Sequence, residues 1–168
     1  MTAVTTATLF SLPDNRIYDL VNTRANIADP RDDTGSRKFV YRTEPFHKSF
    51  DFSEYPYIYL SFPNITQSNP TINGKQKYVG YTQTLIARTI KDGSGASRTD
   101  AGVTDMKSMV DDIFETFNSE TNKSSIRESY LYNLNITLLN SDSMLMDQQD
   151  IHETEFEITY DMRFTVSA

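Results

Sequence analysis

The C-terminal segment, residues 153–166, follows a strict two-residue alternation that constrains the fold more than any other feature of the chain. Its apolar side chains are Phe156, Ile158, Tyr160, Met162, Phe164 and Val166, and its intervening side chains are Glu155, Glu157, Thr159, Asp161, Arg163 and Thr165. Successive side chains of a β-strand point to opposite faces of a sheet, so this pattern predicts a long strand. One face of that strand is apolar and needs a cover, whereas the other is polar and acidic.

Further strands and helices are predicted from the period of the apolar residues. Strands are expected over residues 55–62, 76–90 and 131–139, and helices over residues 12–24 and 105–117. The apolar residues of the second helix, which recur at helical spacing, are Met106, Met109, Val110, Ile113, Phe114 and Phe117. Those of the strand over 131–139 are Tyr132, Leu134, Ile136 and Leu138. Together these elements predict an α/β (α+β) fold: a mostly antiparallel or mixed sheet of about four main strands, with two amphipathic helices on one face.

Capping residues predict where the two helices begin. Ser11 and Asp14 have the spacing of a capping box, and Pro13 is tolerated in a first helical turn. Thr104 is the expected N-cap of the second helix.

The polar segments between these elements predict loops. Loops are expected over residues 29–35, 63–74, 118–127 and 140–152. Residues 28–53 are expected to contain an extended arm that lies over the fold or over a neighbouring subunit. Residues 91–103, which are rich in glycine, serine, threonine and charge, are expected to form a mobile loop. No internal repeat or boundary divides the chain, so residues 1–168 are predicted to form a single domain.

The composition narrows the classes of function. The chain has 168 residues, a formal net charge of -7 and no cysteine. The lack of cysteine excludes disulfides, thiolate metal sites and cysteine nucleophiles. The acidic balance disfavours non-specific binding to duplex DNA, because that affinity comes from lysine and arginine neutralising phosphates. No secretion signal is recognisable, and no apolar stretch approaches the roughly 20 residues that cross a bilayer, so we expect no membrane partner.

No group of residues has the pattern of a catalytic, cofactor or metal site. The two histidines, His47 and His152, lie in no recognisable motif. The acidic residues between 142 and 161 have strand spacing, which places them in a row, whereas calcium needs a converging cage of oxygen ligands. Gly93-Ser94-Gly95 lacks the following lysine–serine pair of a phosphate-binding loop. We therefore predict that the protein is not an enzyme and needs no cofactor or metal.

A stripe of tyrosines marks one side of the strand over residues 55–62. Tyr55, Tyr57 and Tyr59 alternate with apolar residues that point the other way. Such a stripe could stack bases or sugars, but no basic residues surround it. We expect it to pack against the arm or against another subunit.

The order of these elements resembles that of the tail terminator (tail completion) proteins of long-tailed bacteriophages. Those are small α/β proteins with an N-terminal helix, a strand pair, a second helix and a terminal strand pair. The similar parts are residues 17–21, the strands over 55–62 and 76–90, the helix over 105–117, and the closing strands over 131–139 and 153–166.

The resemblance implies a ring, usually hexameric, that caps the tail tube and joins it to the head. It implies a tail tube protein and a neck or head-completion protein as partners, and a place in the virion tail or neck after assembly in the host cytoplasm. It implies no catalysis and no cofactor. An acidic face turned inward would repel passing DNA without binding it specifically.

Within such a ring, two sets of residues become candidates. The lumen candidates are Glu153, Glu155, Glu157 and Asp161. The assembly-interface candidates come from the arm, the tyrosine stripe and the loop over 91–103, since ring closure would use arms and exposed strand edges. They are Arg37, Lys38, Arg42, Tyr55, Tyr57, Tyr59, Lys91 and Arg98.

Two other classes of protein stay open. One is another phage structural component, either a neck adaptor or a tail tube subunit. A tube subunit is dominated by strands and polymerises into long tubes, so the two predicted helices count against it. The other is a non-viral small α+β ligand-binding domain, which needs a concave pocket with converging polar groups. The sequence identifies no such pocket.

Overall fold

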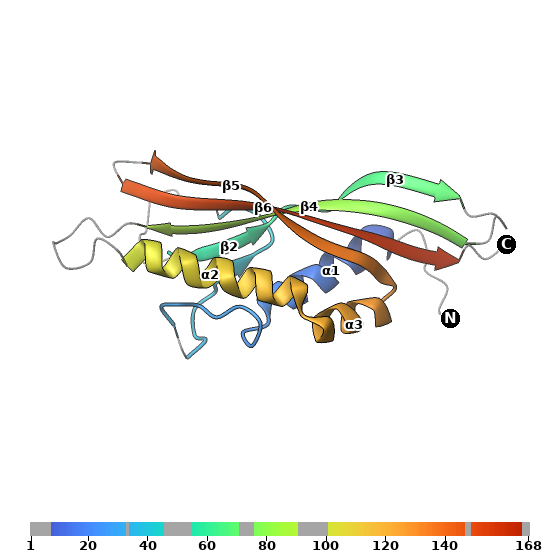
Figure 1. Ribbon diagram of the computed structural model, residues 1–168, viewed down its shortest axis with the longest axis horizontal. Coiled ribbons are helices and arrows are strands. Elements are labelled where there is room, and N and C mark those ends of the chain that lie inside the picture. Colours follow the sequence, from blue (N-terminus) through green and yellow to red (C-terminus); the bar gives the residue numbers. More distant parts are fainter. Residues whose placement is uncertain are drawn as a thin grey trace.

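The computed structural model describes residues 8–32, 34–45, 55–70, 76–90, 101–146 and 149–165 (Figure 1). Within these residues the protein has an α+β fold with three helices and a six-stranded sheet. The helices are α1 (Thr8–Asn22), α2 (Ala101–Asn118) and α3 (Glu120–Glu128). The strands are β1 (Val40–Tyr41), β2 (Tyr57–Leu60), β3 (Asn64–Pro70), β4 (Gln76–Ile90), β5 (Leu131–Met146) and β6 (Gln149–Thr165).

The predicted terminal strand is confirmed as β6, and it lies inside the sheet. The strand order is β1-β2-β4-β6-β5, and β3 also pairs with β4. β6 pairs with β4 from Ile90↔Ile151 to Gln76↔Thr165, and with β5 on its other side. β1 runs parallel to β2 while every other pair is antiparallel, so the sheet is mixed.

The expected numbers of strands and helices, about four and two, were too low. The predicted strand over residues 55–62 is β2, whereas β3 is an additional strand that pairs along the same side of β4. β1 has only two residues, which is too short to produce a periodic pattern in the sequence.

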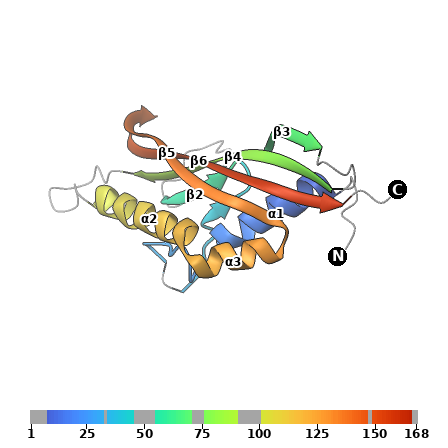
Figure 2. The same cartoon turned by 45° about the vertical axis from the view of Figure 1, so that its right-hand side comes forward.

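The helices all lie on one face of the sheet, and no described helix lies on the other (Figures 1 and 2). Phe156 and Ile158 of β6 are fully buried on the helix side, as are Met109 and Ile113 of α2. The ring of Phe114 meets that of Phe156 edge-on, with centroids 5.5 Å apart. The apolar half of the β6 alternation therefore packs against the helix layer, as its pattern predicted.

Both helices begin earlier than their capping residues predicted. α1 begins at Thr8, so Ser11, Pro13 and Asp14 lie inside it and the capping-box prediction was wrong. α2 begins at Ala101, so Thr104 is also internal. The last residues of the predicted mobile loop, 101–103, are therefore helical, and residues 91–100 lie outside the described part of the chain.

The polar segment over residues 118–127 was predicted to be a linker, but most of it is helical, in α3. Ser119 is the N-cap, and its side chain accepts a hydrogen bond of 3.5 Å from the backbone N–H of Asn122. Glu120 in the first turn and Arg127 in the last turn both suit the helix dipole. Ile126 is the buried residue of this helix. A single apolar contact gives no periodic signal, which explains why α3 was missed. None of the described helices is long and apolar enough to cross a membrane.

Two more predicted loops are strands. Residues 64–70 form β3, and residues 140–146 and 149–152 continue β5 and β6 as far as the pair Met146↔Gln149. Polar side chains dominate these stretches, so the sequence offered no apolar alternation to detect.

Irregularities in β5 also change which of its residues are buried. The register shifts between Tyr132 and Asn135 and again between Leu138 and Asn140. Asn133, which lies in the first shift, has a positive φ of 54°. Before the first shift Leu131 is buried and Tyr132 is aligned with Asp161, so Tyr132 does not lie on the predicted apolar face; after the shift Ile136 is buried as predicted. Leu138 shares the face of Ile136 but is 44% exposed. A bulge adds a residue on one strand only, which ends a simple alternation.

The described part of the predicted arm packs on its own subunit. Its residues Val40 and Tyr41 form β1, beside Ile58 and Tyr59 of β2. Residues 46–54 lie outside the described part of the chain.

Candidate functional site

The sheet face opposite the helices is polar along the middle of β6, and this part of it is the first candidate surface. Glu155, Glu157 and Asp161 lie on it, on the same side of β6, and all three are partly exposed. Their immediate neighbours across the strands are mostly hydroxyl residues, such as Thr84 and Thr137, which both align with Glu157. The structure therefore places three of the four predicted lumen residues in one row on a surface that no described helix covers.

These acids are only weakly engaged by other groups. Asp161 accepts a hydrogen bond of 2.6 Å from the side-chain amide of Asn133. Among the described residues, no cation forms an ion pair with Glu155 or Glu157. The row can therefore present negative charge to a partner or to solvent.

The fourth predicted lumen residue, Glu153, is held in a different environment. Its carboxylate accepts a hydrogen bond from Nε of Arg88 at 2.5 Å. Nη1 of Arg88 donates to Glu44 and, at 3.1 Å, to the hydroxyl of Tyr57. Arg88 is only 7% exposed. Burial disfavours its charge, but the hydrogen bonds to Tyr57, Glu44 and Glu153 outweigh that effect and raise the pKa of Arg88. Glu153 is therefore ion-paired inside its own subunit, where it shares Arg88 with Glu44.

The tyrosine stripe surrounds Arg88 at this end of the sheet. Tyr55 and Tyr57 are almost completely buried, and their ring centroids lie 4.9 Å apart. Tyr41 of the arm meets Tyr57 edge-on at 5.9 Å, so the expected packing of the stripe against the arm is confirmed. Burial is also the main cause that raises the pKa of Tyr59 to about 12. Rings buried in this way are not available to stack bases or sugars.

The basic interface candidates on the arm make contacts within the subunit. Arg37 forms an ion pair with Asp29 at 2.6 Å and donates to the carbonyl of Pro56 at 2.9 Å. Arg42 pairs with Asp14 and lies over the ring of Tyr18. These contacts hold the arm on the fold.

The other basic candidates have different placements. Lys38 is exposed, with its ammonium group 4.6 Å from the centre of the Tyr41 ring. Lys91 and Arg98 lie outside the described residues.

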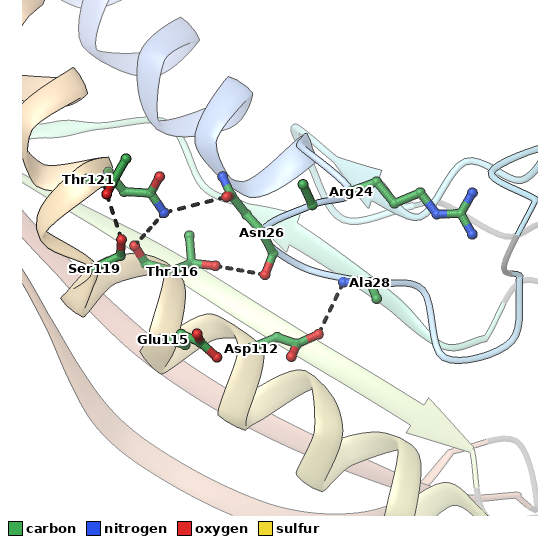
Figure 3. A pocket seen from close by; sticks show the side chains of 10 residues that line it. Arg24, Asn26, Ala28, Asp112, Glu115, Thr116, Ser119 and Thr121 are labelled. Atoms are coloured by element: carbon green, nitrogen blue, oxygen red, sulfur yellow. Dashed lines mark hydrogen bonds between the residues drawn. The ribbon is translucent and has the colours of Figure 1, made fainter.

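A hollow of about 390 Å³ between the α1–β1 connection and the α2–α3 junction is the second candidate site (Figure 3). It is lined by Arg24, Ala25, Asn26, Ala28, Asp112, Glu115, Thr116, Ser119, Thr121 and Asn122.

The polar groups in this hollow mostly bind one another. The N–H of Ala28 donates to Asp112 at 3.1 Å, and the hydroxyl of Thr116 donates to the carbonyl of Asn26 at 2.9 Å. The amide of Asn122 donates to the carbonyl of Thr116 at 3.0 Å. Figure 3 shows these bonds running between the loop and the two helices. They fasten the loop to the helix layer, which leaves few free polar groups for a ligand.

The described residues contain no recognisable reaction centre. No three side chains among their histidines, aspartates and glutamates converge to hold a metal ion. His152 makes one hydrogen bond, between its Nδ1 and the hydroxyl of Ser143 at 2.7 Å. His47, Gly93-Ser94-Gly95 and Asp147 lie outside the described residues.

Comparison with known proteins adds no family to this description. Neither a protein-family model nor a curated protein sequence matches the chain.

Two features of the surface could not be read from the sequence. No sequence pattern singled out Arg88, and only the register places it opposite Glu153. Four apolar residues are exposed at the two edges of the sheet: Phe62, Ile65, Leu138 and Leu139. The sequence patterns had assigned Phe62 and Leu138 to apolar faces, because periodicity does not show where a sheet ends.

Proposed function

We propose that this protein is a virion structural protein of a long-tailed bacteriophage, a tail terminator that forms a ring, capping the tail tube and joining it to the head or neck. The order of elements supports this proposal: α1, the strands β1 to β4, the helices α2 and α3, and the closing strand pair β5–β6. The strand pair of the resemblance corresponds to β2 and β4, which are hydrogen-bonded to each other. The observation that carries it is the one-sided sheet, with helices on one face and an uncovered acidic row on the other. The proposed role needs neither catalysis nor a cofactor.

The acidic row has a physical use in a ring through which DNA passes. Glu155, Glu157 and Asp161 facing a lumen would repeat once per subunit and produce a negative channel wall. Such a wall repels the phosphate backbone, so DNA passes without being held. Glu153 adds little to this field because it is paired with Arg88. The lumen assignment is therefore narrower than the sequence suggested.

The oligomeric state of the purified protein tests the proposal directly. We expect native mass spectrometry to show one closed oligomer, a hexamer for a typical member of this class, and negative-stain images to show rings. Open-ended tubes that lengthen with concentration would favour a tail tube subunit. A protein that stays monomeric at every concentration would contradict self-driven ring closure.

Charge reversal tests the lumen. We expect the wild-type ring to leave linear duplex DNA unbound. The double variant Glu155→Lys/Glu157→Lys should retain DNA, with an affinity that falls steeply as salt is raised. A matched control, Glu120→Lys/Glu128→Lys, makes the same change in net charge on α3 in the helix layer. Equal DNA binding by both double variants would contradict an inward-facing acidic row.

The hollow supports a second candidate, a small α+β ligand-binding domain. Its volume would suit a small polar molecule, whereas its lining groups are already bonded to one another. A tail role predicts that Thr116→Val changes only stability. A ligand-binding role predicts that a metabolite mixture raises the melting temperature of the wild type but not of this variant.

A further inference from the structure

The sheet has two open edges, and both carry exposed apolar side chains. At one edge, Ile65 of β3 is 44% exposed and the nearby Phe62 is 65% exposed. At the other edge, Leu138 and Leu139 of β5 are 44% and 52% exposed. Within the described residues, β3 pairs only with β4 and β5 pairs only with β6. The outer backbone groups of these strands are therefore free to pair with another chain.

Ile65 and Leu138 point to the same side of the sheet. Ile65 is aligned with Tyr81, and Leu138 with Phe156. Directly opposed residues of an antiparallel pair share a face. Tyr81 and Phe156 are both buried on the helix side, so Ile65 and Leu138 also lie on that side, beyond the cover of the helices. If the two edges met, these side chains would extend the core across the junction.

The strand directions suit a head-to-tail junction. β3 is antiparallel to β4, β4 to β6, and β6 to β5, so β3 and β5 run in opposite directions. Rotation about the ring axis into the next position does not change the direction of a strand relative to that axis. Its β3 would therefore lie antiparallel beside β5 of the first copy, and the alternation of directions would continue unbroken. Such a head-to-tail contact generates a ring when the rotation between neighbouring copies closes on a full turn.

The stagger between the two residues also fits a closed sheet. In the register of the sheet, Leu138 lies level with Leu85 and Ile65 with Tyr81, four positions apart along β4. In a closed sheet the strands lie about 4.8 Å apart and are tilted by about 35–45° to the axis of the ring. Each copy contributes the four strands β3, β4, β6 and β5, so the next copy is shifted along the strand direction by about 13–19 Å, or roughly four to six residues. The direction of the stagger depends on the hand of the crossover from β4 to β5 through α2 and α3. With the usual right-handed crossover, the next copy is shifted so that its Ile65 lies level with Leu138 of the first copy.

We propose that the β5 edge of one copy pairs with the β3 edge of the next, and that Leu138 packs against Ile65 of its neighbour. This inference rests on the ring of the proposed function and names the surface that closes it. In a ring closed by this contact, the helices lie on the outside of the continuous sheet. The row of Glu155, Glu157 and Asp161 then faces the centre.

Cross-linking tests this contact, because the chain has no cysteine of its own. Chains with Ile65→Cys and chains with Leu138→Cys are mixed and treated with a short bis-maleimide. We expect covalent dimers from the mixture and none from either variant alone. Chains carrying both substitutions should give a ladder that ends at the subunit number found by native mass spectrometry. In the matched control, chains with Ser108→Cys, an exposed position of α2, are mixed with chains with Leu138→Cys in place of the Ile65→Cys chains. This mixture should give no dimer.

A charge pair tests the same contact without a cross-linker. Leu138→Glu should weaken association on the order of tenfold or more, because it places an unpaired carboxylate in the junction. Adding Ile65→Lys should restore part of the loss.

The outcomes separate this inference from the ring itself. Strong dimers from Leu138→Cys alone would mean that two β5 edges pair about a two-fold axis, which overturns the inference. A ring in the mass spectrum without the mixed cross-link would overturn the inference and leave the ring standing. Monomers at every concentration, with no cross-link, would overturn both.

Discussion

The two faces of β6 are protected from water by different means. On the helix side, Phe156 and Ile158 are fully buried by apolar packing against the helix layer. On the other side, Glu155 and Glu157 are partly exposed, and among the described residues the tyrosines around Arg88 cover one end of that face. One face is therefore stabilised by non-directional burial, and the other by a local network of directed hydrogen bonds.

The difference shows how one strand can serve two purposes. Apolar contacts on the helix side define the fold, so substitutions there act on stability. The middle of the opposite face contributes little to stability, so its composition is free to serve a partner or a channel. The Arg88 cluster is intermediate, because it is polar but buried.

The largest effect should come from the helix side. Phe156→Ala should lower the free energy of unfolding by about 3–5 kcal/mol, because it leaves a cavity against Phe114. Its neighbour on the other face provides the control: Glu157→Ala should change stability by no more than about 0.5 kcal/mol. Urea unfolding followed by circular dichroism measures both, and equal losses would erase the distinction between the two faces.

A smaller but still large effect should come from the buried charge. Arg88→Ala removes the buried partner of the partly buried Glu153 and leaves that acid without its ion pair, so we expect a loss of about 3 kcal/mol. The same unfolding experiment applies. A loss below about 1 kcal/mol would show that this end of the face is as tolerant as its acidic middle.

The two acids bound to Arg88 should differ from each other. The side chain of Glu153 is 19% exposed and that of Glu44 is 50% exposed. Glu153→Gln should therefore cost about 1–2 kcal/mol, whereas Glu44→Gln should cost less than about 0.5 kcal/mol. If Glu44→Gln proves the more damaging change, the arm contributes more to this cluster than its exposure indicates.

The smallest effect concerns pH. Burial raises the pKa of Tyr59 from 10.0 to about 12, so the folded state keeps this proton to higher pH than the unfolded state does. The stability linked to it is complete below pH 10 and is lost as the pH rises through 12. Tyr59→Phe should make the alkaline loss of stability less steep, as measured by unfolding across that range. An unchanged slope would contradict a perturbed Tyr59.

The parts of the fold that could be predicted were those with a strong apolar period. β6 and the core face of α2 were found because Phe156, Ile158, Met109 and Ile113 recur at strand or helix spacing. α3 and the continuation of β5 and β6 beyond the predicted strands were missed because capping and strand pairing hold them, and neither leaves an apolar pattern. For the candidate surface, the sequence indicated that Glu155 and Glu157 share a face, which the structure also shows.

By itself the sequence determined that a long strand has one apolar and one acidic face, because side-chain alternation is a local property of extended backbone. It also excluded cysteine chemistry. Only the tertiary structure decided that Glu153 is paired with Arg88 and that Ile65 and Leu138 are exposed at opposite edges of the sheet. Those facts depend on strand register and strand order, which arise from contacts between residues far apart in the chain.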